Sequence, residues 1–190
     1  MAIITFYYLL RVGEYTYHPP SEKHRTLKYT IQDIALWSGT KQLPHTLPAA
    51  TLHAQSTSAT PSILNQKSDQ KNQSVHQEAT GTDTCPIIAI IRRLTTIRNN
   101  TFNPQTCISA HFTHDSNNPR LLHTSDMTAT IRHAVTIQNL ECHGLLPDLM
   151  GSHSLRAGGA MAMYLNGVSI TTIKNLGQWM SDSFLMYIHE

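Results

Sequence analysis

Apolar residues recur at helical spacing in two stretches of the chain. The first stretch follows Pro86, a residue favoured in the first turn of a helix, and its apolar positions share one face: Ile87, Ile90, Ile91, Leu94 and Ile97. The second follows Ser125 and repeats the pattern with Met127, Ile131, Ala134 and Val135. Residues 3–10 are apolar almost throughout but are too few to span a bilayer. We therefore predict two amphipathic helices and one short buried helix near the start.

The intervening pattern favours β-strands. Four segments are rich in β-type residues: 26–30, 34–37, 59–64 and 74–79. The last two flank the polar stretch 65–73, as the strands of a hairpin would. Pro61 has no N–H, which places its strand at a sheet edge or a bulge. Residues 99–118, rich in Asn, Thr and His, are predicted to form a surface loop. The fold class is therefore predicted to be α+β.

Three short helices are predicted in the last quarter of the chain. Ser152 caps the first, which stops at Gly167. The second covers residues 169–176. Asp182 or Ser181 caps the third, which has an apolar side. Three helices as short as these can converge on one small volume.

The candidate chemistry lies on these helices. His153 and Arg156 are three residues apart, so both project from one face of the first helix. Gly177 bounds the turn after the second helix, and Tyr187 lies on the third. This arrangement would gather phosphate-binding groups around a potential nucleophile. It is the outline of a DNA strand-transfer site.

These motifs resemble the catalytic domain of the tyrosine recombinase (phage integrase) family, especially the recombinases of eukaryotic mobile elements of the Crypton and tyrosine-recombinase retroelement types. The family's His-x-x-Arg box is matched by His153-Ser154-Leu155-Arg156, and its nucleophile by Tyr187. Its opening Leu-Arg-x-x-Glu helix is matched by residues 10–14, which contain Arg11. The lysine that the family carries on a β-hairpin is best matched by Lys67.

The resemblance implies a fold, a domain organisation and partners. The fold would be a mostly helical α+β catalytic domain with a small antiparallel β-sheet carrying the lysine hairpin, over residues 1–190. Family members also have an N-terminal DNA-clamping domain and a C-terminal docking tail, and neither is found here, so the chain is expected to be a catalytic-domain fragment. Its partner would be double-stranded DNA. Self-association into a synaptic tetramer is expected of a full-length form, and a monomer of this fragment.

The chemistry explains why these residue types occur together. Attack on a phosphodiester places negative charge on its non-bridging oxygens, and the guanidinium groups of Arg11 and Arg156 are suited to holding it. A tyrosine hydroxyl has a pKa of about 10, so Tyr187 needs nearby positive charge and help from His153 with its proton. By resemblance, Lys67 would protonate the departing 5′ oxygen. The product is a 3′-phosphotyrosyl link, and neither a cofactor nor a metal is required.

Three further residues modify this picture. Gln178 occupies the position where the family usually has His or Trp, and Trp179 is its neighbour. The Gln178 amide and the Trp179 indole N–H can both hydrogen-bond a phosphate oxygen. Glu14, three residues after Arg11, is predicted to orient that arginine as supporting structure rather than to act catalytically.

Composition adds limits. The chain has 190 residues, of which 40% are hydrophobic and 14% charged, values that suit one globular domain. A net charge of +2 would not by itself point to nucleic acid. Three cysteines without paired spacing favour reduced thiols inside a cell, and a nuclear location follows only from the DNA interpretation.

Two other functions compete with recombination. A decayed or domesticated relative would still bind DNA without cutting it, an alternative that Gln178 favours. A zinc-binding, His-rich interaction domain is the other, with Cys107, His111 and His114 as ligands. DNA cleavage alone would not establish integration, since the related type IB topoisomerases use a similar residue set to relax DNA.

Overall fold

The computed structural model describes residues 1–17, 28–63, 73–101, 103–113, 116–179 and 181–188. Within these ranges the fold is α+β, as predicted. The α-helices are α1 (Ala2–Tyr8), α2 (Val12–Tyr15), α3 (Ala49–Gln55), α4 (Pro86–Asn100), α5 (Thr124–Ile137), α6 (Ser152–Leu165) and α7 (Ile170–Gly177). The 3₁₀ helices are η1 (Ile31–Asp33), η2 (Leu140–His143), η3 (Pro147–Leu149) and η4 (Asp182–Tyr187).

Antiparallel strands form two sheets. The larger has the order β2-β1-β3-β4, with β5 also paired to β3, and consists of β1 (Ile34–Ser38), β2 (Lys41–Leu43), β3 (Ser58–Ile63), β4 (Gln73–Ser74) and β5 (Gln77–Glu78). The smaller consists of β6 (His111–Thr113) and β7 (Ser116–Arg120). The predicted hairpin is confirmed by the pairing of β3 with β4, and its connection, with Lys67, lies outside the described residues.

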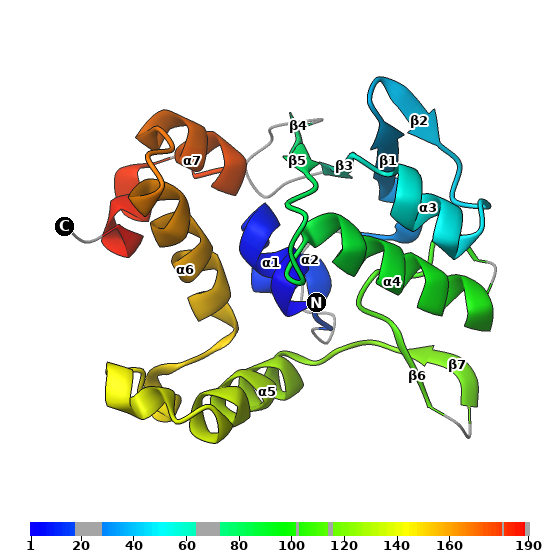
Figure 1. The fold of residues 1–190 in the computed structure, drawn as a ribbon. Helices are drawn as coiled ribbons and strands as arrows, with labels where there is room; N and C mark the ends of the chain where they lie inside the picture. Colours follow the sequence, from blue (N-terminus) through cyan, green and yellow to red (C-terminus); the bar gives the residue numbers. More distant parts are fainter. Residues whose placement is uncertain (18–27, 64–72, 102, 114–115, 180, 189–190) are drawn as a thin grey trace.

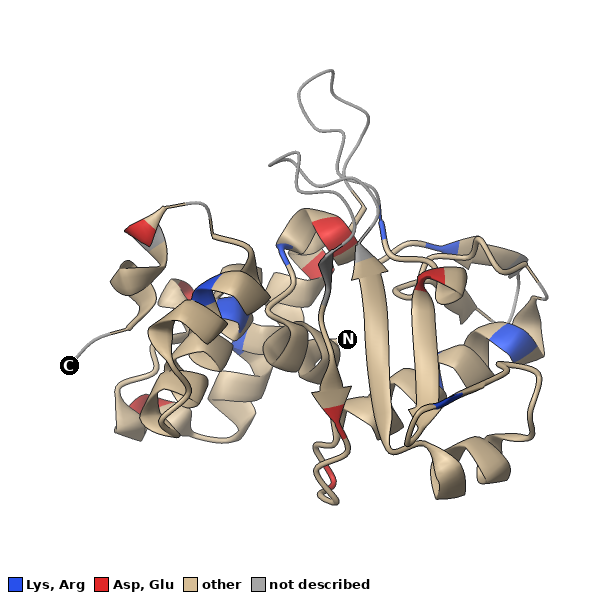
Figure 2. Ribbon diagram, turned by 90° about the horizontal axis from the view of Figure 1, so that it is seen from above, with Lys and Arg blue, Asp and Glu red and all other residues tan. Residues whose placement is uncertain are grey.

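Helices α1 and α2 lie between two parts of the molecule. Figures 1 and 2 show α6, α7 and η4 on one side of them and the larger sheet with α3 and α4 on the other. The main core includes the buried face of α4, whose five predicted apolar residues are all buried. A second cluster packs the end of α1 against α6, α7 and η4 through Leu9, Ala160, Ile173 and Phe184. The site described below lies around this second cluster.

Close contact between α1 and α6 depends on one glycine. A Cβ on Gly159 would lie 2.7 Å from Leu9 Cδ2 and closer still to the backbone oxygen of Phe6. The neighbouring Gly158 has room, since its Cβ would meet Phe6 Cε2 at 3.7 Å. Because Gly159 has no side chain, the backbone of α6 can approach the Phe6 backbone and the Leu9 side chain closely.

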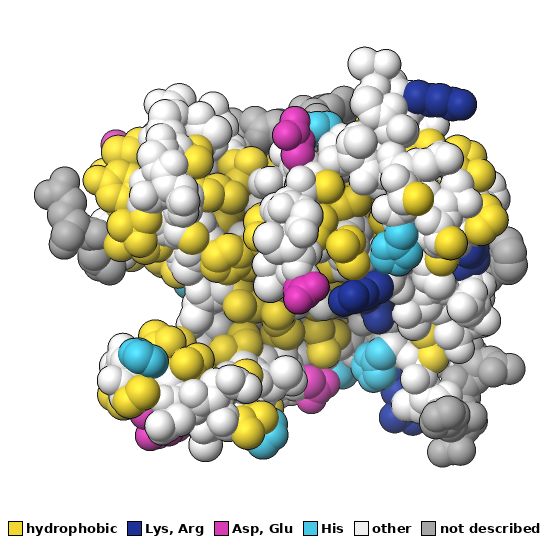
Figure 3. Space-filling view, viewed as in Figure 1, with side chains coloured by type: hydrophobic (Ala, Val, Ile, Leu, Met, Phe, Trp, Pro, Cys, Tyr) yellow, Lys and Arg dark blue, Asp and Glu magenta, His cyan; other side chains and the backbone are white. Residues whose placement is uncertain are grey.

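Helix α5 extends away from the main core. Its predicted apolar face is confirmed only in part: Met127 and Val135 are buried, whereas Ala134 is exposed. A cleft of about 740 Å³ runs between α5 and the start of α1, and Figure 3 shows hydrophobic side chains along this hollow. None of the helices within the described ranges has both the length and the apolar character needed to cross a bilayer.

Several predictions about local structure were wrong. Residues 28–30 form no strand, because the backbone N–H and hydroxyl of Thr30 both donate to Asp33 Oδ2 and start η1 instead. Residues 99–118, predicted as a loop, include β6 and most of β7. Strand β3 is internal rather than at an edge. Pro61 lies opposite Val75, at the gap between the part of β3 that pairs with β4 and the part that pairs with β5. The Pro61 carbonyl accepts a hydrogen bond from the Val75 N–H, but proline has no N–H to donate in the other direction.

Candidate functional site

The C-terminal helices form at residues that the sequence marks. Helix α6 begins after Gly151 and ends before Asn166, and α7 begins after Ser169, whose hydroxyl accepts a hydrogen bond from the Thr172 N–H at 3.1 Å. The predicted extents of both helices are confirmed, but the prediction that Ser152 caps α6 was wrong, because Gly151 is the N-cap and Ser152 is the first helical residue. The third predicted helix is the 3₁₀ helix η4, which begins at Asp182. Helix α6 and η4 carry three of the candidate residues, His153, Arg156 and Tyr187, and the turn after α7 adds Gln178 and Trp179.

Arg156 is buried at the centre of the site. From α6, its Nη1 donates to the carbonyl of Leu9 at 2.7 Å and its Nη2 to the carbonyl of Gly177. Its guanidinium carbon lies 4.2 Å from the centroid of the Trp179 ring, a cation–π contact. Burial, and then the nearby charge of Arg11, lower the pKa of Arg156 to about 10, so the group is charged at neutral pH. Arg156 therefore joins α1, α6 and α7 with a buried positive charge.

Arg11 lies beside Arg156 and is held by Glu14. It is the N-cap of α2, so it precedes the helix in which it was predicted. Its Nη2 donates to the carbonyl of Gln178 at 2.7 Å, and its Nη1 lies 3.8 Å from Glu14 Oε1. The backbone N–H of Arg11 donates to Glu14 Oε2 at 2.7 Å, so the carboxylate orients both ends of the residue, as predicted.

Glu14 is a buried carboxylate between two arginines. Burial raises its pKa, while the hydrogen bond from the Arg11 backbone and the charges of Arg11 and Arg156 act against this. Two guanidinium groups and one carboxylate leave a positive balance when all three are ionised. A site with this balance favours an anion.

His153 and Tyr187 form a hydrogen-bonded pair. His153 Nε2 and Tyr187 Oη are in contact, with ring centroids 5.1 Å apart and ring planes inclined at 62°. Burial, and then the charge of Arg156, lower the pKa of His153 below its ordinary value of 6.5. The imidazole is therefore neutral at pH 7, and its ring nitrogen can accept the hydroxyl proton of Tyr187.

The turn after α7 packs tightly against these groups. Gln178 has a left-handed backbone (φ 56°), and the backbone N–H of Trp179 donates to the carbonyl of Lys174. Trp179 lies between Arg156 and Tyr187, with its ring centroid 6.0 Å from that of the tyrosine. A Cβ on Gly177 would overlap the indole ring. Only glycine fits at this position without displacing Trp179.

The fold thus brings seven of the eight candidate residues together: Arg11, Glu14, His153, Arg156, Gln178, Trp179 and Tyr187. Lys67 lies outside the described residues, so its place in the site remains a prediction. The sequence did not indicate that the carbonyl groups of Leu9 and Gly177 accept hydrogen bonds from Arg156, because every residue has a backbone carbonyl. The positive φ of Leu9 (48°), which turns the chain after α1, has no sequence signal either.

The structure does not support the zinc alternative: among the described residues, no three His, Cys, Asp or Glu side chains are placed to hold a metal ion. Cys107 is buried, with its sulfur 3.2 Å from the Ser109 hydroxyl, and His111 is exposed on β6. His114 lies outside the described ranges. These observations give no support to the pair Cys107 and His111 as zinc ligands.

Comparison with known proteins gives no match: no family model, no curated protein and no solved structure is significantly similar to the chain. The functional argument therefore starts from the geometry of the site and from the motifs in the sequence.

Proposed function

We propose that the protein cleaves and rejoins double-stranded DNA, with Tyr187 as the nucleophile, and that in a full-length tetrameric form it carries out site-specific recombination or integration of a mobile element in the nucleus. The observation that carries the proposal is the contact between His153 Nε2 and the Tyr187 hydroxyl, beside the charged Arg156. A proton acceptor, a nucleophile and a cation for the phosphate thus lie side by side.

The proposed reaction proceeds as follows. The Tyr187 oxygen attacks phosphorus, and its proton passes to neutral His153. The bond between phosphorus and the 5′ oxygen breaks, and that oxygen takes a proton, from Lys67 by the family resemblance. Rejoining is the reverse, with the 5′ hydroxyl displacing the tyrosine. Each step conserves the number of phosphoester bonds, so it needs no external energy source.

The arginines stabilise charge in this scheme. Arg156 uses two of its five N–H donors on backbone carbonyls, which fix the guanidinium in place before substrate binds. Preorganised donors of this kind stabilise developing charge without reorganising during the reaction. Arg11, half-buried and oriented by Glu14, supplies the second cation.

A DNA-binding remnant without cleavage activity is the second candidate. The burial of Arg156 and its bonds to two carbonyls favour it, because those bonds also give the arginine a purely structural role. Gln178 favours it as well, since it donates and accepts hydrogen bonds but cannot carry a proton as histidine does. This candidate predicts DNA binding without a covalent product.

A denaturing gel separates the two candidates. The protein is incubated with labelled, nicked duplexes from the ends of its own element, and a native gel is run in parallel. A retarded band that survives denaturant, is lost in Tyr187→Phe and persists in the matched control Tyr164→Phe supports strand cleavage through Tyr187. Native binding without that band supports the remnant. Relaxation of supercoiled plasmid would point to a topoisomerase-like outcome.

A further inference from the structure

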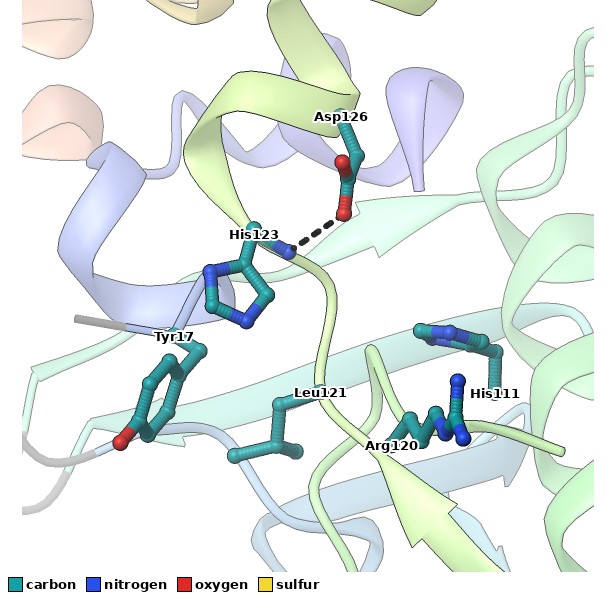
Figure 4. A pocket seen from close by; sticks show the side chains of 6 residues that line it. All are labelled: Tyr17, His111, Arg120, Leu121, His123 and Asp126. Atoms are coloured by element: carbon teal, nitrogen blue, oxygen red, sulfur yellow. Dashed lines mark hydrogen bonds between the residues drawn. The ribbon is translucent and has the colours of Figure 1, made fainter. Parts of the chain in front are cut away.

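A second pocket, of about 370 Å³, opens beside the N-terminus of α5. Its lining residues come from three separate segments: Tyr17, His111, Arg120, Leu121, His123 and Asp126. Figure 4 shows their side chains arranged around one opening, with Arg120 and His111 close together at one end and Tyr17 and His123 at the other. None of these residues belongs to the site around Tyr187, so the pocket is separate from it.

The backbone fixes the positions of these groups. His111 and Arg120 are paired across β6 and β7, so their side chains lie on the same face of the small sheet. The Tyr17 N–H donates to the carbonyl of Leu122 at 2.7 Å, and the Tyr17 ring centroid lies 5.0 Å from that of His123. Tyr17 follows α2 and Arg11 precedes it, so this short helix connects the pocket to the site that contains Arg11.

The balance of charge in the pocket is positive. Arg120 lines it directly, and Lys28 contacts one of the lining residues, with its Nζ 4.7 Å from the centroid of the Tyr17 ring. The N-terminus of the 14-residue helix α5 adds a partial positive charge. Among the described lining residues the one carboxylate is Asp126, which accepts from the His123 backbone N–H at 3.3 Å and caps that helix. Among the described residues at the pocket and next to it, two cations and a helix terminus therefore outweigh one acid.

We propose that this pocket binds a backbone phosphate of duplex DNA away from the cleaved bond. The guanidinium fork of Arg120 suits a phosphate, and the ring N–H groups of His111 and His123 can donate to the same group. An anion fits better than a metal ion, because the part of the chain that is described holds no metal-binding cluster. The identity of the ligand as duplex DNA rests on the proposed function.

The test is the salt dependence of duplex binding, measured by fluorescence anisotropy with a short labelled duplex over a series of KCl concentrations. The full chain carries Tyr187→Phe throughout, so that no covalent product forms. Arg120→Ala should weaken binding several-fold at moderate salt and reduce the slope of log K against log salt by about one, as expected for one lost phosphate contact. Arg120 is exposed, and far-UV circular dichroism should show an unchanged fold.

The matched control is Lys41→Ala, which removes one positive charge from exposed β2, outside the pocket. It should leave the slope nearly unchanged. Equal slopes for the two variants, or no binding of the duplex at all, would overturn the proposal. The outcome is distinct from that of the cleavage gel: a slope change without any covalent band leaves this phosphate site in place and removes strand cleavage.

Discussion

Replacing Gly177 by alanine tests the packing that joins Trp179 to Arg156 and Tyr187. The new Cβ would overlap the six-membered ring of the indole, and ordinary contact begins near 3.4 Å, so the ring must retreat by more than about 1 Å. Overpacking of this kind costs about 1–3 kcal/mol, and weakening of the cation–π contact costs roughly 0.5–1 kcal/mol more. Alanine regains about 1 kcal/mol of helix propensity.

The net expectation for Gly177→Ala is a loss of about 0.5–3 kcal/mol in the free energy of unfolding, which lowers the Tm by roughly 2–4 °C per kcal/mol in a chain of this size. Urea unfolding followed by far-UV circular dichroism measures it. The sharper assay repeats the substitution in a Trp179→Leu background, where the overlapping ring atoms are absent. There Gly177→Ala should be neutral or slightly stabilising. A coupling energy below about 0.5 kcal/mol would refute the overlap as the cause.

Two further predictions concern α6. Gly159→Ala should destabilise the protein by about 1–3 kcal/mol, because its Cβ overlaps Phe6, whereas the adjacent Gly158→Ala should be neutral or stabilising; equal urea midpoints for the two variants would contradict the close helix approach. Since burial and Arg156 lower the pKa of His153, the unfolded state binds more protons, and the stability that His153 contributes is present above its unfolded pKa near 6.5 and is lost as pH falls. The stability difference between wild type and His153→Gln should therefore change below pH 6.5, and a constant difference from pH 7.5 to 5 would count against this assignment.

Local signals predicted the secondary structure around the site well. Helix α7 follows a serine cap, and α6 ends beside an asparagine, so their bounds depend on residues near in sequence. The apolar face of α4 was equally clear, since five buried residues recur at helical spacing. The β-type residues near Thr30 gave a wrong strand prediction, because the local hydrogen bonds from Thr30 to Asp33 compete with strand pairing.

The site itself was only partly predictable. Motif spacing identified Arg156 and Tyr187 as candidates, but it gave no indication that Arg156 is buried or that its partners are backbone carbonyls. Those facts depend on how α1 packs against α6, which Gly159 permits and no periodicity reveals. The pocket beside α5 was missed for the same reason, because Arg120 and Tyr17 are brought together only by tertiary structure.

The bonds that hold the two arginines also govern when the site can form. Arg156 reaches a carbonyl 147 residues away, and Arg11 reaches one 167 residues away. Closing loops of that length costs conformational entropy, which is offset only by the contacts of the complete fold. Contacts between residues so distant in sequence also slow folding. During synthesis Arg11 leaves the ribosome long before Gln178 exists. A partly made chain therefore carries an incomplete site, and the two arginines reach their final positions only in the finished fold.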